Sequence, residues 1–238
     1  MTDSKAPAAF DIGIIAAMQI ELDGIAAKLS DIKKETVGSI QFMCGTLYGK
    51  KVVCAVCGVG KVFAAMCAQT MILKYSPACI VNTGVAGGLA SGLRVLDVVA
   101  ADSVVQHDMD TSALGDPVGM ISGINTVKIP CDETVLSTLK ASVEAVGAHC
   151  VCGTVASGDR FIADAKSREY IKSTFGAAAC EMEGAAVGQV CFVNRVPFGV
   201  LRAVSDCGDD SAPEDFPAFA KKAAAISSGA VLEFVKRI

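Results

Sequence analysis

The chain has 238 residues, of which 52% are hydrophobic and 19% charged, and its formal net charge is −4. This composition allows a large core and excludes a disordered protein, and the lack of a basic stripe excludes a nucleic-acid-binding surface. Charged residues and glycines interrupt the most apolar regions, so we expect neither a transmembrane segment nor a signal peptide, no membrane partner, and a cytoplasmic location.

The predicted elements alternate between strands and helices along the chain. For the amino-terminal half the patterns predict a strand over 10–18, an amphipathic helix over 20–29, a hairpin over 39–58 that turns at 48–50, a helix over 61–75, and strands over 77–84 and 94–106 separated by a glycine-rich loop. For the other half they predict helices over 132–147, 165–176 and 184–196, a buried strand over 197–206, and a last helix that starts at the capping box Ser211–Glu214. This alternation predicts an α/β fold in a single domain over residues 1–238, with ligands at the carboxyl ends of the strands.

The eleven cysteines do not form a metal or disulfide pattern. Cys54 and Cys57 are three residues apart in a predicted strand, so their side chains point to opposite faces. Cys150 and Cys152 share a face, but no second pair follows at the spacing of zinc ligands. We therefore expect free, mostly buried thiols and no metal site.

Two glycine-rich segments follow apolar strands. Gly58–Lys61 begins like a dinucleotide-binding loop, but Phe63 stands where a third glycine belongs and no acidic residue follows at the ribose-binding distance. A tight strand-to-helix turn is the better interpretation. Residues 82–89, NTGVAGGL, have three glycines in five positions, which suits either a ligand-binding backbone or a plain flexible turn.

Several acidic residues stand in apolar surroundings, where an ionised carboxylate is costly unless it is paired or hydrogen-bonded. Glu181 and Glu183 occur in the segment CEMEGAAV, and Asp206 ends a buried strand. Arg202, four residues before Asp206, should point to the same face of that strand. Glu21 follows the first strand, where a first-turn acid at a helix start is the plainer interpretation.

Together these segments resemble the 5′-methylthioadenosine/S-adenosylhomocysteine nucleosidases of the nucleoside phosphorylase family. The resemblance rests on six segments in collinear order: IGIIAAMQIEL, CGVGKVFAA, NTGVAGGL, SGDRFI, CEMEGAAV and VPFGVLRAVSD. It implies a three-layer α/β/α sandwich around a mixed, partly barrel-like sheet, usually in a homodimer. It further implies hydrolysis of an N-glycosidic bond to adenine and a 5-substituted ribose, in methionine salvage and without a cofactor.

The resemblance also assigns roles to residues. Asp206 would donate a proton to N7 of adenine, Glu21 would deprotonate the attacking water, and Glu183 would hold the ribose hydroxyls. Three acids in three roles suit this chemistry, because the leaving base must be protonated and the sugar becomes oxocarbenium-like. The other implied substrate contacts are Met182 along the sugar, Phe161 stacked on adenine, the backbone of Ile162 at the adenine edge, Ala86 and Gly87 beside the ribose, Ser205 and Arg202 in support of Asp206 or its neighbours, and Glu181 as a further hydroxyl contact or a structural pair.

Two positions depart from the family pattern. Val85 stands where many members carry serine, and Leu114 where a phenylalanine of the partner subunit often closes the 5′ pocket. Phe216 remains available to close that pocket. These differences leave the 5′-substituent open among methylthioadenosine, S-adenosylhomocysteine, 5′-deoxyadenosine and aminodeoxyfutalosine.

Two rival functions stay open on the sequence alone. A purine nucleoside phosphorylase would use phosphate instead of water, but the loop after the first strand, AAMQIE, offers Glu21, which would repel an anion. A nucleoside-binding protein without catalysis would be expected to lose at least one of the three acids, and all three are present.

Overall fold

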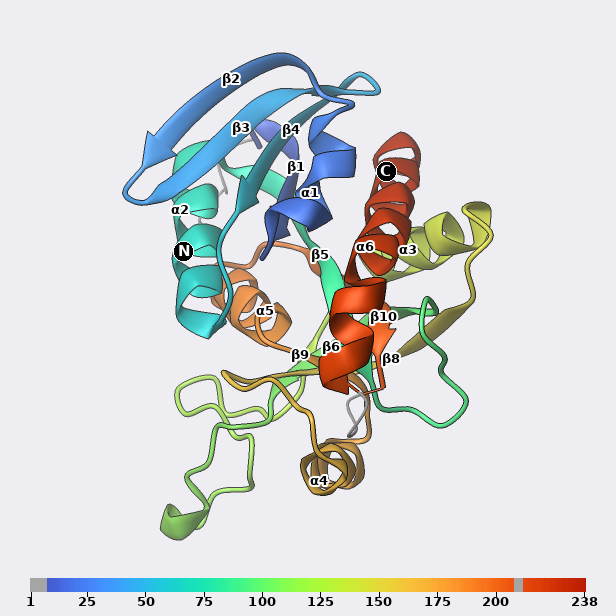
Figure 1. Cartoon of the computed structure of the whole chain (residues 1–238). Helices are drawn as coiled ribbons and strands as arrows, with labels where there is room; N and C mark the ends of the chain where they lie inside the picture. Colours follow the sequence, from blue (N-terminus) through green and yellow to red (C-terminus); the bar gives the residue numbers. More distant parts are fainter. Residues whose placement is uncertain (1–7, 208–211) are drawn as a thin grey trace.

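The computed structural model describes residues 8–207 and 212–238 (Figure 1). The strands are β1 Phe10–Ala16, β2 Ser30–Val37, β3 Ile40–Leu47, β4 Lys50–Val56, β5 Pro77–Gly88, β6 Val98–Gln106, β7 Ile129–Pro130, β8 Cys150–Ser157, β9 Ala177–Glu181 and β10 Phe198–Asp206. The helices are α1 Gln19–Ala26, α2 Lys61–Tyr75, the short 3₁₀ helix η1 Ser112–Leu114, α3 Glu133–Ala145, α4 Ala165–Phe175, α5 Gly184–Val193 and α6 Ala212–Arg237. They confirm the predicted α/β class.

The strands form one mixed sheet, part of which closes into a barrel. The order is β10-β6-β8-β9-β5-β1-β4-β3-β2, and an additional pairing of β10 with β5 closes the first five strands on themselves. Strand β5 is the junction, because it pairs in parallel with β1 and β10 and in antiparallel with β9. Both β5 and β10 are buried almost throughout, which accounts for their long apolar runs.

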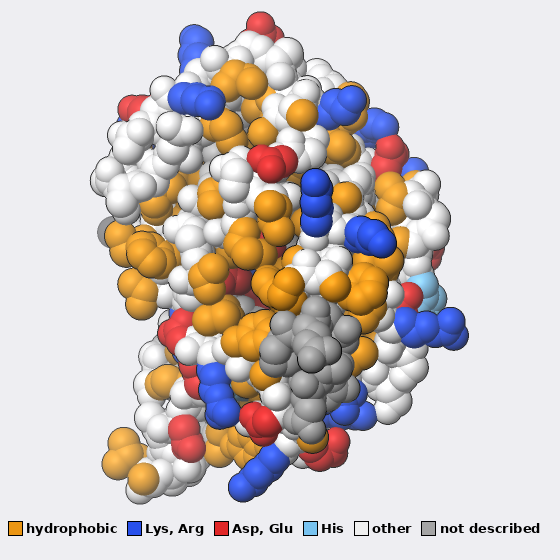
Figure 2. Space-filling model, in the orientation of Figure 1, with side chains coloured by type: hydrophobic (Ala, Val, Ile, Leu, Met, Phe, Trp, Pro, Cys, Tyr) orange, Lys and Arg blue, Asp and Glu red, His pale blue; other side chains and the backbone are white. Residues whose placement is uncertain are grey.

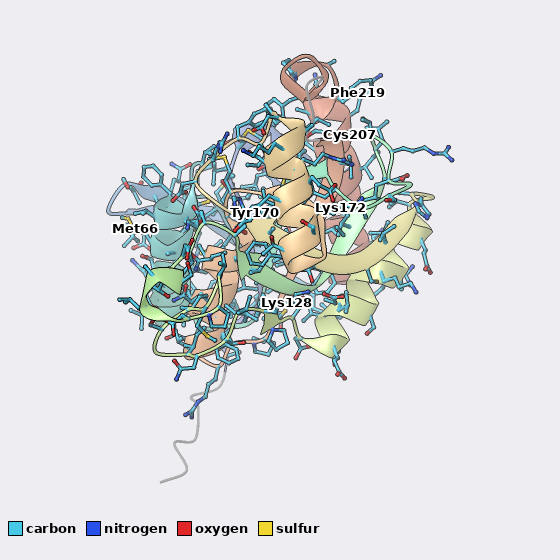
Figure 3. The ribbon with its side chains drawn as sticks, turned by 90° about the horizontal axis from the view of Figure 1, so that it is seen from below. Met66, Lys128, Tyr170, Lys172, Cys207 and Phe219 are labelled. Atoms are coloured by element: carbon cyan, nitrogen blue, oxygen red, sulfur yellow. The ribbon has the colours of Figure 1, made fainter. Side chains whose placement is uncertain are left out.

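Helices cover both faces of the sheet (Figure 1). Helix α6 packs against α1, α3, β5 and β10 on one side, whereas α2 packs against α5 on the other. The predicted three-layer sandwich is therefore confirmed. Helix α4 runs below the sheet and contacts β8 and β9; Figure 3, seen from below, shows it with Tyr170 and Lys172.

The predicted hairpin has the expected turn. Strands β3 and β4 are antiparallel, with Leu47 opposite Lys50. The two residues between them, Tyr48 and Gly49, have φ values of 50° and 82°. A two-residue turn with two positive φ values matches the right-handed twist of the strands.

The prediction ended one strand too early and missed four others. Residues 85–88, expected to begin a glycine-rich loop, are the end of β5 and lie buried beside β9 and β10. Strand β2 was missed because its side chains are almost all exposed, so it has no hydrophobic alternation. Strands β7, β8 and β9 were also missed.

Two remaining expectations concern the chain's last helix and membranes. The predicted capping box includes Ser211, which lies outside the described residues; the helix itself is present as α6. Within residues 8–207 and 212–238, no helix is long and apolar enough to cross a membrane.

Candidate active site

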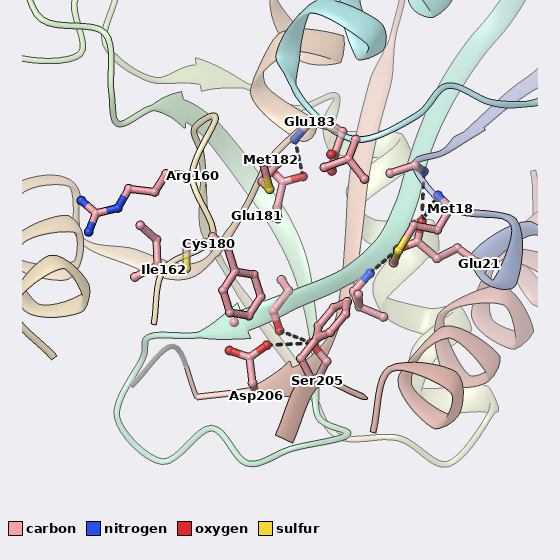
Figure 4. A pocket seen from close by; sticks show the side chains of 17 residues that line it. Met18, Glu21, Arg160, Ile162, Cys180, Glu181, Met182, Glu183, Ser205 and Asp206 are labelled. Carbon is pink, nitrogen blue, oxygen red and sulfur yellow. Dashed lines mark hydrogen bonds between the residues drawn. The ribbon is translucent and has the colours of Figure 1, made fainter. Parts of the chain in front are cut away.

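A cavity of about 160 Å³ lies where the carboxyl ends of several strands converge. Its wall is formed by residues that follow β1, β4 and β8, by the last residues of β5, β9 and β10, and by the start of α6. Figure 4 draws the seventeen side chains: Ala17, Met18, Glu21, Val59, Val85, Ala86, Gly87, Arg160, Phe161, Ile162, Cys180, Glu181, Met182, Glu183, Ser205, Asp206 and Phe216. In Figure 2 the acidic side chains lie deep in a hollow among hydrophobic ones. The cavity lies at the strand ends, where the sequence predicts that ligands bind.

Glu21 is held rigidly at one end of the cavity. It lies in the first turn of α1 and is 2% exposed. Its Oε2 accepts hydrogen bonds from the backbone N–H groups of Ala17 at 2.9 Å and Met18 at 2.8 Å, and its Oε1 accepts one from Val85 at 3.0 Å. A carboxylate has about four acceptor positions, so one remains for another donor. Burial raises the pKa of Glu21, although Arg202 and these N–H groups oppose the shift.

Glu181 is fully occupied by protein donors. It accepts from the backbone N–H of Glu183 at 3.0 Å and from that of Gly184 at 2.8 Å. The hydroxyl of Ser157 and the guanidinium of Arg202 also donate to it. All four acceptor positions are thereby used. Of the two roles left open for Glu181, these contacts favour the structural pair, although Glu181 also touches the cavity.

Arg202 is a buried counter-ion rather than a wall of the cavity. It is fully buried, its Nη2 donates to Asn82 and Glu181, and the same atom lies 3.7 Å from Oε2 of Glu183. Burial works against its charge, but Glu181, Glu183 and Glu21 together raise the pKa of Arg202. Arg202 thus supports Glu181 and Glu183, and a direct contact with the substrate stays a prediction.

Glu183, in contrast to Glu181, keeps acceptor positions open. Strand β9 ends at Glu181 and α5 begins at Gly184, where the sequence predicts a helix start, so Glu183 stands at the N-cap position and its side chain makes no capping hydrogen bond. Its Oε1 accepts from the backbone N–H of Gly60 at 2.8 Å, and the carboxylate lies at the cavity wall. Burial and the neighbouring Glu181 raise the pKa of Glu183 to about 7, in spite of Arg202.

Asp206 lies on the opposite side of the cavity from Glu183 (Figure 4). It ends β10, is 2% exposed, and has its Oδ2 at 2.9 Å from the hydroxyl of Ser205. The pairing with β5 shifts register between Val204 and Asp206, which is a β-bulge. The extra residue reverses the side-chain alternation. The expectation that Arg202 and Asp206 share a face is therefore wrong.

Apolar side chains and bare backbone form the rest of the wall. Phe161 and Phe216 meet edge to face with their ring centroids 5.6 Å apart, and Phe161 is half-exposed rather than a core residue. Ile162 and Met182 also line the cavity, Met182 next to Glu181 and Ile162 on the side of Arg160 (Figure 4). In β5, Ala86 and Gly87 present their backbone to the cavity beside Val204 and Asp206. A flat, largely apolar ligand can fill such a space.

Leu114 does not take part in this cavity. It is 84% exposed and lies in η1, within a segment that projects from the body of the molecule (Figure 1). Its predicted place at a partner's pocket stays a prediction.

The sequence reasoning did not single out several residues of the site. Ala17, Met18, Val59, Arg160 and Cys180 line the cavity, and each lies inside one of the six segments quoted above. The residues that hold Glu181 and Arg202 were also missed, namely Asn82 and Ser157. The sequence did contain a sign of their role, because each is a polar residue in an otherwise apolar strand. A buried polar side chain is costly unless it has a hydrogen-bond partner.

The comparison with known proteins agrees with this geometry. The family model described as the phosphorylase superfamily matches residues 11–236. A 5′-methylthioadenosine/S-adenosylhomocysteine nucleosidase of Shewanella loihica is 36% identical over 229 residues, which cover 95% of this chain and 99% of that relative. The chain belongs to the 5′-methylthioadenosine/S-adenosylhomocysteine nucleosidase family of this superfamily.

Solved structures extend the family likeness to three dimensions. The nucleosidase of Neisseria meningitidis, in complex with methylthio-immucillin-A, matches with a TM-score of 0.93 and 34% identity over 96% of this chain and 99% of its own. The futalosine hydrolase of Helicobacter pylori matches with a TM-score of 0.92 and 32% identity over 97% and 99%. The residues that the family model matches, 11–236, include the whole site from Glu21 to Phe216.

Proposed function

We propose that the protein hydrolyses the N-glycosidic bond of adenosyl nucleosides such as 5′-methylthioadenosine or S-adenosylhomocysteine, releasing adenine and a 5-substituted ribose. One observation carries the proposal: three buried carboxylates, Glu21, Glu183 and Asp206, surround a single apolar cavity from different sides. Glu21 accepts from three backbone N–H groups, Glu183 from the N–H of Gly60, and Asp206 from the hydroxyl of Ser205. Three separated acids fit the three tasks of this reaction.

Asp206 is the proposed general acid. The bond between ribose and adenine breaks easily only if the departing base is protonated, for which N7 of adenine is available. The hydroxyl of Ser205, 2.9 Å from Oδ2 of Asp206, fixes the carboxyl group. Phe161 and Ile162 line the same cavity and would bind the purine by stacking and through the backbone.

Glu183 and Met182 are the proposed ribose contacts. Glu183 has open acceptor positions toward the cavity, which suit the two hydroxyls of a ribose. Its negative charge, when ionised, also stabilises an oxocarbenium-like sugar. The backbone of Ala86 and Gly87 would line the same sugar, as the sequence resemblance implies.

Glu21 is the proposed base. Three backbone N–H groups hold its carboxylate, and the one remaining acceptor position can orient a water molecule toward the sugar. The raised pKa of Glu21 brings its proton affinity closer to what a base needs near neutral pH.

The cavity wall argues against a phosphorylase. Among its described residues the only cation is Arg160, whose guanidinium is paired with Asp164 at 3.1 Å. Glu21 and Glu183 would repel phosphate. Water is therefore the better nucleophile for this site.

The experiment is to measure adenine release by the purified protein in phosphate-free buffer. We expect turnover with 5-substituted ribose as the second product. Dependence on added phosphate, with ribose 1-phosphate as the product, would establish a phosphorylase instead. Binding without turnover would establish a nucleoside-binding protein.

The 5′-substituent is a separate question. The futalosine hydrolase of Helicobacter pylori is about as similar to this chain as the nucleosidases are, so aminodeoxyfutalosine is a second candidate substrate. Val85, Met18 and Phe216 leave that end of the cavity apolar. We expect methylthioadenosine, with its small apolar tail, to have the highest kcat/KM in a panel that also contains S-adenosylhomocysteine, 5′-deoxyadenosine and aminodeoxyfutalosine.

We further propose a cytoplasmic homodimer that acts in methionine salvage, as the resemblance implies. The exposed apolar side chains Val62, Phe63 and Met66 on α2 support the dimer, since such a patch on a single face is typical of an interface. Met66 points outward from α2 in Figure 3. Sedimentation of the wild-type protein and of Met66→Glu tests this: we expect a dimer that the variant weakens, and a wild-type monomer would contradict the proposal.

A further inference from the structure

Helix α2 begins in a way that its local sequence does not explain. Its N-cap is Gly60, which has φ 102° and no side chain to accept from the first N–H groups. Its first turn contains no acidic residue, and its first residue is Lys61. A cation is unfavourable at a helix N-terminus, where the helix dipole is positive. Local rules broken in this way are often found next to functional sites.

Acids from distant parts of the chain take the place of the missing cap. The N–H of Gly60 donates to Oε1 of Glu183 at 2.8 Å, and the N–H of Lys61 donates to Oδ1 of Asp159 at 2.8 Å. The start of α2 is therefore a carboxylate-binding site, and one of its two carboxylates is the proposed ribose contact Glu183.

The side chain of Lys61 closes a ring around this helix start. Its Nζ donates to Oδ1 of Asp108 and, at 3.2 Å, to Oε1 of Gln106. Asp108 in turn accepts from the N–H of Asp159 at 2.9 Å, and Asp159 accepts from the N–H of Lys61. The ring joins the start of α2 to the segments that follow β6 and β8. Although partial burial opposes it, bonding to Lys61 and Asp159 lowers the pKa of Asp108.

This ring restrains the backbone next to the N–H of Gly60. The carbonyl of Gly60 and the N–H of Lys61 belong to one planar peptide unit, so the bond from Lys61 to Asp159 fixes that unit. Only the φ and ψ rotations of Gly60 separate it from the N–H that donates to Glu183. The fit is close, because a Cβ at Gly60 would stand 3.1 Å from Oδ1 of Asp159. A loosened ring would let the Gly60 N–H leave Glu183.

We propose that Lys61, Asp108 and Asp159 are positioning residues that hold Glu183 in place for the ribose hydroxyls. The proposal rests on the proposed function of Glu183. The three residues do not line the cavity, so they act through Gly60 and not on the substrate.

The test compares two substrates in each variant: 5′-methylthioadenosine and its 2′,3′-dideoxy analogue, which lacks the hydroxyls that Glu183 would hold. We expect Lys61→Met and Asp108→Asn to lower kcat/KM for methylthioadenosine about tenfold, the effect of one hydrogen bond to a charged group. The kcat/KM for the analogue should change little. The preference for the hydroxyls, which is the ratio of the two kcat/KM values, should therefore fall by about the same factor.

Lys74→Met is the matched control. Lys74 lies in the last turn of the same helix and pairs with the exposed Glu35, far along α2 from the cavity. It should leave the preference for the hydroxyls unchanged. Asp108→Asn keeps the shape of the side chain, so it remains informative if Lys61→Met does not fold.

The outcomes separate this proposal from the proposed function. If both variants keep the wild-type preference for the ribose hydroxyls, the ring is only structural and the proposal is overturned, even if total activity falls. If the wild-type protein releases no adenine, the proposed function fails. Calorimetric affinities for the same two nucleosides then give the preference for the hydroxyls in each variant.

Discussion

Glu181 and Glu183 are two residues apart, yet their surroundings differ in kind. Glu181 accepts from Ser157, Arg202 and two backbone N–H groups, whereas Glu183 accepts from Gly60 and faces the cavity. The end of β9 at Glu181 and the start of α5 at Gly184 cause the difference, because the chain changes direction between them. Glu181 thus builds the site, and Glu183 is available to a ligand.

This contrast predicts different effects for the two amide variants. Glu181→Gln leaves the buried guanidinium of Arg202 with its closest charge partner removed, so we expect the free energy of unfolding to fall by about 3–5 kcal/mol. Glu183→Gln should lower turnover of ribose-containing substrates while costing less stability at neutral pH. Urea unfolding and adenine release of both variants check this. Equal losses of stability would show that the two carboxylates have the same role.

Asp206→Asn tests the proposed general acid. The amide cannot donate a proton to N7 in the way a carboxylic acid can, so we expect turnover to fall by about 10²–10⁴-fold with affinity for the nucleoside largely retained. Adenine release and calorimetric binding measure the two effects. Ser205→Ala is the control, since it removes only the supporting hydroxyl and should cost less. Unchanged turnover in Asp206→Asn would refute the assignment.

At the residue scale the sequence predicted which acids meet but not what holds them. Glu183 and Asp206 stood out because ionised groups in apolar segments need a reason, whereas Glu21 was singled out only by the family resemblance. The shared face expected for Arg202 and Asp206 was wrong because a β-bulge cannot be read from side-chain alternation, and the bulge between Val204 and Asp206 reverses it.

At the element scale, β5 determines how closely the acids can approach the sheet. A Cβ on Gly84 would stand 2.2 Å from Nη1 of Arg202 and 2.6 Å from Oε1 of Glu21. Both side chains therefore need the bare backbone of a glycine in this strand. The glycines of this segment suggested a loop in the sequence, but they permit a strand with charged groups packed directly on it.

Gly84→Ala should therefore damage the site more than the fold. We expect a loss of stability of about 1–3 kcal/mol, typical of overpacking, and a loss of adenine release of at least tenfold because Glu21 is displaced. Gly88→Ala, in the same strand, is the matched control: the atoms nearest its Cβ would be Val204 Cγ1 at 3.1 Å, Val204 Cγ2 at 3.6 Å and the backbone oxygen of Asp206 at 3.6 Å, so its closest contacts are not charged side-chain atoms. Thermal unfolding and kinetics of both variants test this. If the control loses as much activity, the effect belongs to the strand and not to Gly84.

The elements that the sequence predicted well are those with one buried face or with a continuous run of buried residues. Strand β10 and helix α6 have such patterns, and both lie within two residues of their predicted bounds where these can be compared. Strand β2 has no buried face, so only its pairing with β3 makes it a strand. The closure of the barrel through β5 and β10 is likewise a long-range pairing that no local pattern contains.

At the scale of the whole molecule, the buried acids couple stability to pH. Glu183 has a pKa of about 7 in the folded chain against a usual value of 4.5. Between these values the folded state binds a proton that the unfolded state has lost, so this group makes the free energy of unfolding fall as pH rises. Glu21 acts in the same direction through its raised pKa, whereas His107, whose pKa burial lowers, acts in the opposite one.

Because these contributions overlap, the contribution of Glu183 is obtained from a difference. The free energy of unfolding of Glu183→Gln is compared with that of the wild type at each pH. Glutamine does not titrate, so we expect the variant to gain stability relative to wild type as pH rises from about 5 to about 8, by an amount on the order of 1–3 kcal/mol. Acids with lowered pKa values, such as Asp164, titrate below this window and cancel in the comparison. Urea unfolding of both proteins at pH 5, 6, 7 and 8 measures the difference. Parallel profiles would mean that Glu183 is ionised throughout, and its proton would then play no part in the stability of the site.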